Sequence, residues 1–191
     1  MPIVWAEIVE EKSRETKMGD LCRVYGRVVS LLEAAAPWVA LTFLRMLIGW
    51  EFLEAGLEKY RGENWFGHVQ DKFLFPFNLL PVDLNWFLAQ WFEIIGGIAL
   101  IFGLGSRFFA LSLMILTVVA TAAVHWPSEW TTLSELVKGY AITNKGYGNF
   151  KLPVIFMTML IPLFFLGGGR FSVDALLHRF CATFERGGGR H

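Results

Sequence analysis

Charged residues are scarce in this sequence. Only 18% of its 191 residues are Asp, Glu, Lys or Arg, whereas 54% are hydrophobic, and the mean hydropathy is +0.46. A typical soluble domain has about 25% charged residues. The formal net charge is zero, so the positive charge that drives nucleic-acid binding is missing. The composition therefore argues against nucleic acid as a partner and favours a membrane protein.

Cysteine and the common cofactor motifs are also scarce. Cys22 and Cys181 lie near opposite ends of the chain, without a CxxC pair or a Cys/His cluster at zinc spacing, so we expect unpaired thiols. No flavin or nicotinamide fingerprint is present, and His125 is the only histidine that ends an apolar stretch, which excludes a facing haem-ligand pair. Residues 1–19 lack the apolar core of a signal peptide. We therefore do not expect an autonomous redox enzyme.

Four apolar stretches reach or approach the 20 or so residues that cross a bilayer. We expect membrane helices at residues 38–57, 84–104, 108–124 and 152–166, of which the last is the shortest. The sequence thus predicts an all-α membrane protein, a four-transmembrane-helix bundle over residues 38–174.

Lys and Arg are distributed unequally between the two sides of such a bundle. Ten lie in the tails and the second connection, and six lie in the first and third connections. Because basic residues concentrate on the cytoplasmic side, we expect a multi-pass protein of the bacterial inner membrane with both termini in the cytoplasm. Apolar residues at helical spacing opposite arginines predict amphipathic interfacial helices in the tails, residues 1–37 and 175–191.

Ionisable side chains interrupt the apolar stretches. Arg45, Glu51 and Glu54 lie in the first stretch, Glu93 lies in the second, and His125 ends the third. Such groups usually face a bundle interior or a water-filled cavity. We therefore predict one buried polar cavity lined by these five side chains. The long aromatic connection after the first stretch could form its roof.

Arg45 and Glu93 are expected to meet at the floor of this cavity. At 1.5 Å per residue, Arg45 lies about 10 Å above the inner end of its helix and Glu93 about 14 Å below the outer end of the next. In a core about 30 Å thick their heights differ by about 6 Å, within reach of an arginine. The pair would either support chemistry or only fix the helix register.

Three of the same side chains are candidate metal ligands. Glu54 and His125 lie at similar heights near the outer end, and Glu51 lies one turn below Glu54. Together they could bind copper or another divalent cation, or relay protons. The alternative is that Glu54 only reaches interfacial water.

Small residues follow one face of each of the first two stretches. Glycines at such spacing let neighbouring helices approach closely, either within one chain or in a homodimer. Opposite charges on the same faces would support the contact. The residues assigned to this packing are Gly49, Gly56, Lys59, Gly96, Gly97, Gly103 and Arg107.

These residues resemble the signature of DoxX-like membrane proteins. Arg45, Gly49, Phe52, Gly56 and Lys59 match its RxxxGxxFxxxGxxK pattern. The second stretch is similar to its ExxGG segment. The resemblance extends over residues 38–174. Further matches are Leu100, Gly103, Arg107, His125, the glycine run 167–169, Ser172, Val173 and Asp174. Asp174 is assigned a structural charge.

The resemblance implies an inner-membrane helix bundle with an accessory role. Glu51, Glu54 and the Pro-containing loop 75–81 are similar to the HvfX-type subgroup, encoded beside enzymes that modify copper-binding peptides. That subgroup implies copper or metallopeptide handling, with the bilayer and a small modified peptide as partners. One alternative is a quinone-interacting subunit with a soluble redox partner. In it Arg45 or His125 would donate a hydrogen bond to a quinone carbonyl, and Phe52 and Trp91 would flank the ring. A second alternative is a structural anchor for a soluble protein.

Overall fold

The computed structural model describes residues 2–188, with side chains from residue 18 to residue 183. All regular structure in this part of the chain is helical. The chain divides into two compact units, Met1–Ala40 and Leu41–His191.

The first unit is the beginning of helix α1 (Pro2–Arg61). Its described side chains form an amphipathic helix, in which Arg23 donates a hydrogen bond of 3.2 Å to Asp20 on the polar face. The apolar face is uncovered within this unit, and its placement on a membrane surface stays a prediction. The exposed apolar side chains are Met18, Leu21, Val24, Tyr25, Val28, Leu31 and Leu32.

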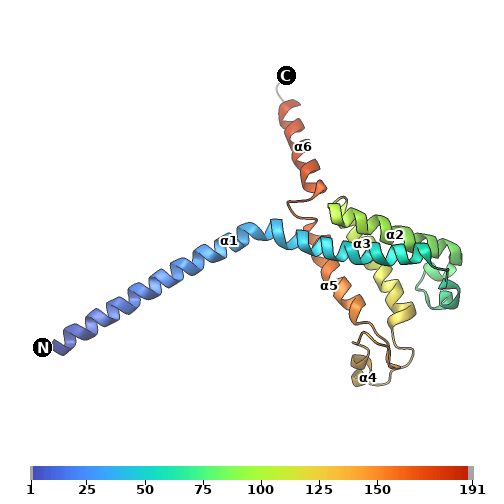
Figure 1. The fold of residues 1–191 in the computed structure, drawn as a ribbon, viewed down its shortest axis with the longest axis horizontal. Coiled ribbons are helices and arrows are strands. Elements are labelled where there is room, and N and C mark those ends of the chain that lie inside the picture. Colours follow the sequence, from blue (N-terminus) through green and yellow to red (C-terminus); the bar gives the residue numbers. More distant parts are fainter. Residues whose placement is uncertain (1, 189–191) are drawn as a thin grey trace. The chain divides into compact units, whose positions relative to one another are not determined.

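The second unit contains the rest of α1 and five further α-helices (Figure 1). The long ones are α2 (Val82–Phe102), α3 (Ser106–Ala120), α5 (Lys151–Leu166) and α6 (Val173–Gly188). A π-helical turn, η4 (Thr121–His125), extends α3. The connections carry the short helices η1 (Phe66–His68), η2 (Gln70–Lys72), η3 (Phe77–Leu79) and α4 (Leu133–Lys138).

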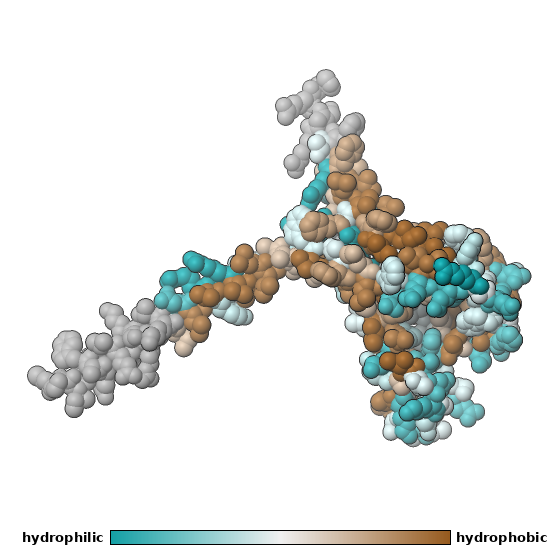
Figure 2. Space-filling view, viewed as in Figure 1, coloured by the Kyte–Doolittle hydropathy of each residue, from teal (hydrophilic) through white to brown (hydrophobic). Residues whose placement is uncertain are grey.

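Three described helices are long and apolar enough to cross a membrane: Met18–Arg61, Val82–Phe102 and Ser106–His125. Helix α5 has 16 residues and is therefore about 24 Å long, shorter than a hydrocarbon core of about 30 Å. The apolar spans agree with the sequence prediction, and the fourth crossing stays a prediction. Exposed apolar side chains, such as Ile95 on α2 and Phe108 on α3, cover much of the helix surface, as lipid contact requires (Figure 2).

Two glycines let α1 and α2 pack backbone against backbone. A Cβ atom on Gly49 would lie 2.8 Å from the carbonyl oxygen of Gly97, and one on Gly97 would lie 2.6 Å from the carbonyl oxygen of Gly49. Farther along, a Cβ on Gly56 would lie 2.7 Å from a side-chain carbon of Ile94. The two helices therefore run antiparallel, and the glycine stripe of α1 is covered by α2 of the same chain.

The turn between α2 and α3 is held by the start of α6. Gly103 and Gly105 have φ of 71° and 57°, a left-handed conformation that glycine adopts without strain. The carboxylate of Asp174 accepts hydrogen bonds from the backbone N–H groups of Gly105 (2.7 Å) and Ser106 (2.8 Å). Its own N–H donates to the carbonyl oxygen of Gly103 at 3.0 Å. The negative charge also complements the α3 dipole.

The far end of the unit is covered by the connection between α1 and α2. Phe66 and Phe73 are buried there against Ala123 of η4. The side-chain amide of Gln70 donates to three backbone carbonyl oxygens of the segment from Phe77 to Leu80, the shortest of these bonds being 2.6 Å. The long connection is therefore a fixed cover.

The third connection contains α4, which begins with a capping box. The backbone N–H of Glu135 donates to the Thr132 hydroxyl, and the Glu135 carboxylate accepts from the backbone N–H groups of Thr131 and Thr132. The bonds from Thr131 and Thr132 hold the pKa of this carboxyl below its ordinary value. These bonds fix the start of α4.

Candidate functional site

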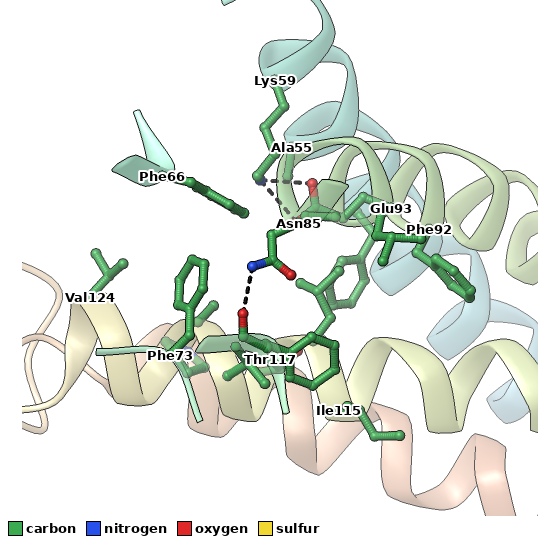
Figure 3. Close-up of a pocket in the computed structure, with 18 of the residues that line it drawn as sticks. Ala55, Lys59, Phe66, Phe73, Asn85, Phe92, Glu93, Ile115, Thr117 and Val124 are labelled. Carbon is green, nitrogen blue, oxygen red and sulfur yellow. Dashed lines mark hydrogen bonds and ion pairs between the residues drawn. The ribbon is translucent and has the colours of Figure 1, made fainter. Parts of the chain in front are cut away.

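A cavity of about 550 Å³ lies between α1, α2, α3 and α5 beneath the long connection. Figure 3 shows Lys59 and Glu93 facing each other on its wall. Most of the lining is apolar and much of it is aromatic. The phenylalanine and tryptophan side chains of the lining are Phe52, Trp65, Phe66, Phe73, Phe77, Phe92 and Phe156. The polar side chains are Lys59, Asn85, Glu93, Ser112, Thr117 and His125.

The cavity reaches into the part of the bundle that would contact lipid. Phe92 and Ile115 line it from the middle of α2 and α3, yet they are 36% and 47% exposed. Helix α2, and α3 together with η4, are long and apolar enough to span a membrane. The cavity is therefore flanked by apolar helix surface that a bilayer would cover.

A buried ion pair interrupts the apolar wall. The ammonium group of Lys59 lies 2.9 Å and 2.7 Å from the two carboxylate oxygens of Glu93, and the two side chains are 18% and 4% exposed. A buried charge without a partner is strongly unfavourable, so each of these groups stabilises the other in place. The pair is neutral overall, which makes the wall a poor site for an anion or a free cation.

His125 reaches the same cavity from the π-helical turn. Its Nδ1 atom lies 2.9 Å from the side-chain oxygen of Asn149, and the Asn149 backbone N–H donates to the His125 carbonyl oxygen at 3.0 Å. The π turn has one residue more than an α-helical turn, and such turns are frequent at functional sites. Two bonds to one asparagine therefore fix both the backbone and the ring of His125.

Arg45 lies at the other end of the contact between α1 and α2 from this cavity. It is buried, 4% exposed, and its Nη2 atom donates to the carbonyl oxygen of Phe171. The guanidinium group lies against Gly103, at the end of α2. The predicted pairing of Arg45 with Glu93 is wrong, because the antiparallel register puts Arg45 opposite the last residues of α2 and Glu93 next to Gly56.

Glu51 and Glu54 do not line the cavity. Glu51 is half-buried and Glu54 is exposed, because both lie on the side of α1 away from its contact with α2. His125 lines the cavity and so is separated from them. Among the residues that the structure describes, no group of three or more His, Cys, Asp and Glu side chains is arranged to hold a metal ion. The three predicted metal ligands are not brought together.

The remaining residues assigned to structural charge and packing lie as follows. Gly96 is buried, and a Cβ there would lie 3.2 Å from the Leu113 side chain of α3. Arg107 is exposed near Gly167 at the end of α5. Cys22 and Cys181 are both free and exposed. None of these four residues belongs to the cavity lining.

Asn85 is a cavity residue that the sequence reasoning missed. Its amide nitrogen donates to the Phe77 carbonyl oxygen at 2.7 Å and to the Gln70 side-chain oxygen at 3.1 Å. The signal was present, because Asn85 precedes Glu93 by eight residues and therefore shares its face of α2. Thr117 of α3 was missed as well, since a single hydroxyl in an apolar helix carries little information.

Comparison with known proteins gives a family. The DoxX family profile matches residues 40–126, which include most of the cavity lining. An uncharacterized protein of Haemophilus influenzae is 43% identical over 152 residues, covering 80% of this chain and 92% of the relative. No solved structure matches the chain significantly.

Proposed function

The chain belongs to the DoxX family of membrane proteins, and we propose from that premise that its cavity binds a ring-bearing, membrane-soluble ligand of the quinone class. The protein would act as an accessory subunit that holds this ligand for a partner. The observation that supports the proposal is a neutral ion pair, Lys59 and Glu93, set in a mostly apolar and aromatic wall.

The shape and polarity of the cavity favour such a ligand. A volume of about 550 Å³ is within the range of small-molecule pockets. Aromatic side chains such as Phe52 and Phe156, whose ring centroids are 5.4 Å apart, offer stacking and edge contacts to a flat ring. A fatty acid or phosphate ester would meet the Glu93 carboxylate, whereas a neutral ring with oxygen substituents would meet both partners of the ion pair.

The geometry favours this function over the other two that the sequence leaves open. Copper or metallopeptide handling, the HvfX-type expectation, lacks support because Glu51, Glu54 and His125 do not converge. A purely structural anchor has no need of a cavity lined by a buried ion pair. The unequal distribution of Lys and Arg supports both termini in the cytoplasm of a bacterial inner membrane, with the cavity cover on the opposite side.

The test is direct binding by the purified full-length protein in a mild detergent. A short-chain benzoquinone should quench the fluorescence of tryptophans near the cavity, such as Trp65, in a saturable way. The double variant Lys59→Met with Glu93→Leu removes both charges together, which avoids leaving one buried and unpaired. We expect it to weaken binding about tenfold, the effect of losing a polar contact of about 1.4 kcal/mol.

The matched control is Glu54→Gln, an exposed carboxylate on the same helix outside the cavity. It should bind the benzoquinone as the natural protein does. Absence of saturable quenching in the natural protein, together with absence of quinone in a solvent extract of it, would exclude the proposed function. An anchor function predicts that the double variant changes stability alone.

A further inference from the structure

Several polar side chains around the cavity have their hydrogen-bond donors engaged inside the protein. The hydroxyl of Ser112 donates to the Phe108 carbonyl oxygen at 2.9 Å, and the hydroxyl of Thr117 donates to the Leu113 carbonyl oxygen at 2.7 Å. In both cases the single O–H group is used, whereas the oxygen lone pairs are available. These residues can accept a hydrogen bond from a ligand but cannot donate one without breaking a bond of the helix.

Asn85 follows the same pattern. The Gln70 amide nitrogen faces three backbone carbonyl oxygens, so the Gln70 side-chain oxygen must face Asn85. The Asn85 nitrogen in turn donates to that oxygen and to the Phe77 carbonyl oxygen, which uses both of its N–H groups. Its own side-chain oxygen has no hydrogen-bond partner among the described residues but is fully buried, so it does not face the cavity, and Asn85 offers a ligand no free donor.

His125 also offers an acceptor. The Asn149 side-chain nitrogen donates to the carbonyl oxygen of Ile142, so the Asn149 atom next to His125 is the carbonyl oxygen, an acceptor. The Nδ1 atom of a neutral His125 must then carry the proton. Its Nε2 atom is left with a lone pair, because a neutral imidazole has one donor and one acceptor nitrogen.

Donors are few by comparison. Two bonds join the Lys59 ammonium to Glu93, leaving one N–H group, and Trp65, which is 41% exposed, adds one indole N–H group. The ionised Glu93 adds further acceptor capacity. The cavity therefore has more unused acceptors than donors. A ligand with only carbonyl oxygens would leave most of these acceptors unpaired, which is costly in an apolar site.

We infer that the cavity selects a ring that donates hydrogen bonds, so that it binds the hydroquinone form in preference to the quinone form. This inference rests on the proposed function and adds the redox state of the ligand. Thr117 and His125 are the residues that set the preference, through acceptor atoms. The protein would then hold the hydroquinone, which is the form that a quinone reductase produces and a hydroquinone oxidase consumes.

The experiment compares three ligands that share one ring and one short alkyl chain: the hydroquinone, the quinone and the hydroquinone dimethyl ether. Binding to the natural protein is measured by fluorescence quenching without oxygen. We expect the hydroquinone to bind at least tenfold more tightly than the ether, which has the same oxygens without donors. The quinone should resemble the ether.

The outcomes separate the two proposals. Equal affinity for all three ligands, or tighter binding of the quinone, would overturn the inference while the proposed function stands. Binding of none would overturn the proposed function and the inference with it. A hydroquinone preference of tenfold or more supports both.

Two variants identify the acceptors. Thr117→Val keeps the side-chain shape and His125→Phe keeps a ring, and each should reduce the hydroquinone preference several-fold while binding of the ether stays unchanged. His178→Phe is the matched control, because His178 lies on α6 outside the cavity. An unchanged preference in both cavity variants would contradict the assignment.

Discussion

Replacing Gly97 by alanine should push α1 and α2 apart. A Cβ atom there would lie 2.6 Å from the Gly49 carbonyl oxygen, 2.7 Å from the Leu53 backbone nitrogen and 3.0 Å from the Leu53 Cα atom. Every one of these neighbours is backbone, so no side-chain rotation relieves the contact. The helices must separate by about 0.8 Å, the difference between 2.6 Å and the 3.4 Å at which ordinary contact begins.

The expected cost follows from packing. Adding one methyl group to a close-packed interface usually costs 1–3 kcal/mol, and we expect Gly97→Ala in the upper half of that range, about 2–3 kcal/mol. Alanine substitutions at two other glycines of the chain serve as comparisons. Gly96→Ala meets only the Leu113 side chain at 3.2 Å, which can move, and should cost less. Gly26→Ala meets nothing within 4 Å and should stabilise the helix by up to about 1 kcal/mol.

Denaturant unfolding in a mild detergent, followed by far-ultraviolet circular dichroism, would measure the unfolding free energies of the three variants and the natural protein. The order from least to most stable should be Gly97→Ala, Gly96→Ala, natural protein and Gly26→Ala. The same displacement moves Phe52 and Lys59 relative to Glu93, so ligand affinity should fall with Gly97→Ala. Gly97→Ala within about 0.5 kcal/mol of Gly26→Ala, a difference typical of neutral surface substitutions, would refute the backbone contact.

Three further predictions concern charges outside the cavity. Asp174→Ala removes the acceptor of two backbone N–H groups at the start of α3 and should lower the unfolding free energy by about 2 kcal/mol; Asp20→Ala, at an exposed pair, should have little effect. Glu51→Gln with Glu54→Gln should leave copper binding, followed by titration calorimetry, unchanged; loss of a site would contradict the geometry. The pKa of Glu135 is lowered, so its contribution to α4 is present above the ordinary glutamate value of about 4.3 and is lost as the pH falls below it. The hydrogen-exchange protection of α4 amides, corrected for the intrinsic exchange rate at each pH, should fall there.

The apolar helices were predictable because the hydropathy of a segment depends only on the amino acids that it contains. The predicted span 84–104 corresponds to α2, Val82–Phe102, and the span 108–124 lies within Ser106–His125. Lipid and protein interior both exclude polar groups, so a run of apolar residues marks a helix in either environment. The length of α1 was not predictable in this way, since hydropathy does not mark where a helix continues beyond the bilayer.

The cavity was predictable only in part. Glu93 and His125 line it, whereas Arg45, Glu51 and Glu54 do not. The rule that an ionisable group inside a membrane helix needs a partner holds for Glu93 and Arg45, but it does not say which partner. Arg45 donates a hydrogen bond to the backbone carbonyl of Phe171, and the carboxylate that attracts it is that of Asp174 rather than Glu93. Such a bond between segments far apart in the sequence leaves no periodic signal.

The partner of Glu93 could nevertheless have been found from the glycines. Heights estimated from the assumed membrane boundaries carry an error of a full helical turn, because the true ends of the helices are unknown. A close glycine contact carries no such error. Once Gly49 lies opposite Gly97 in an antiparallel pair, residues 41–45 must meet the end of α2, and Glu93 must lie near Gly56. The nearest cation on that face is then Lys59, one turn beyond Gly56, and it is the residue that the structure pairs with Glu93. Backbone contacts between small residues are thus a better guide to register than charge complementarity in a membrane helix pair, because few registers let two glycines meet while many allow opposite charges to approach.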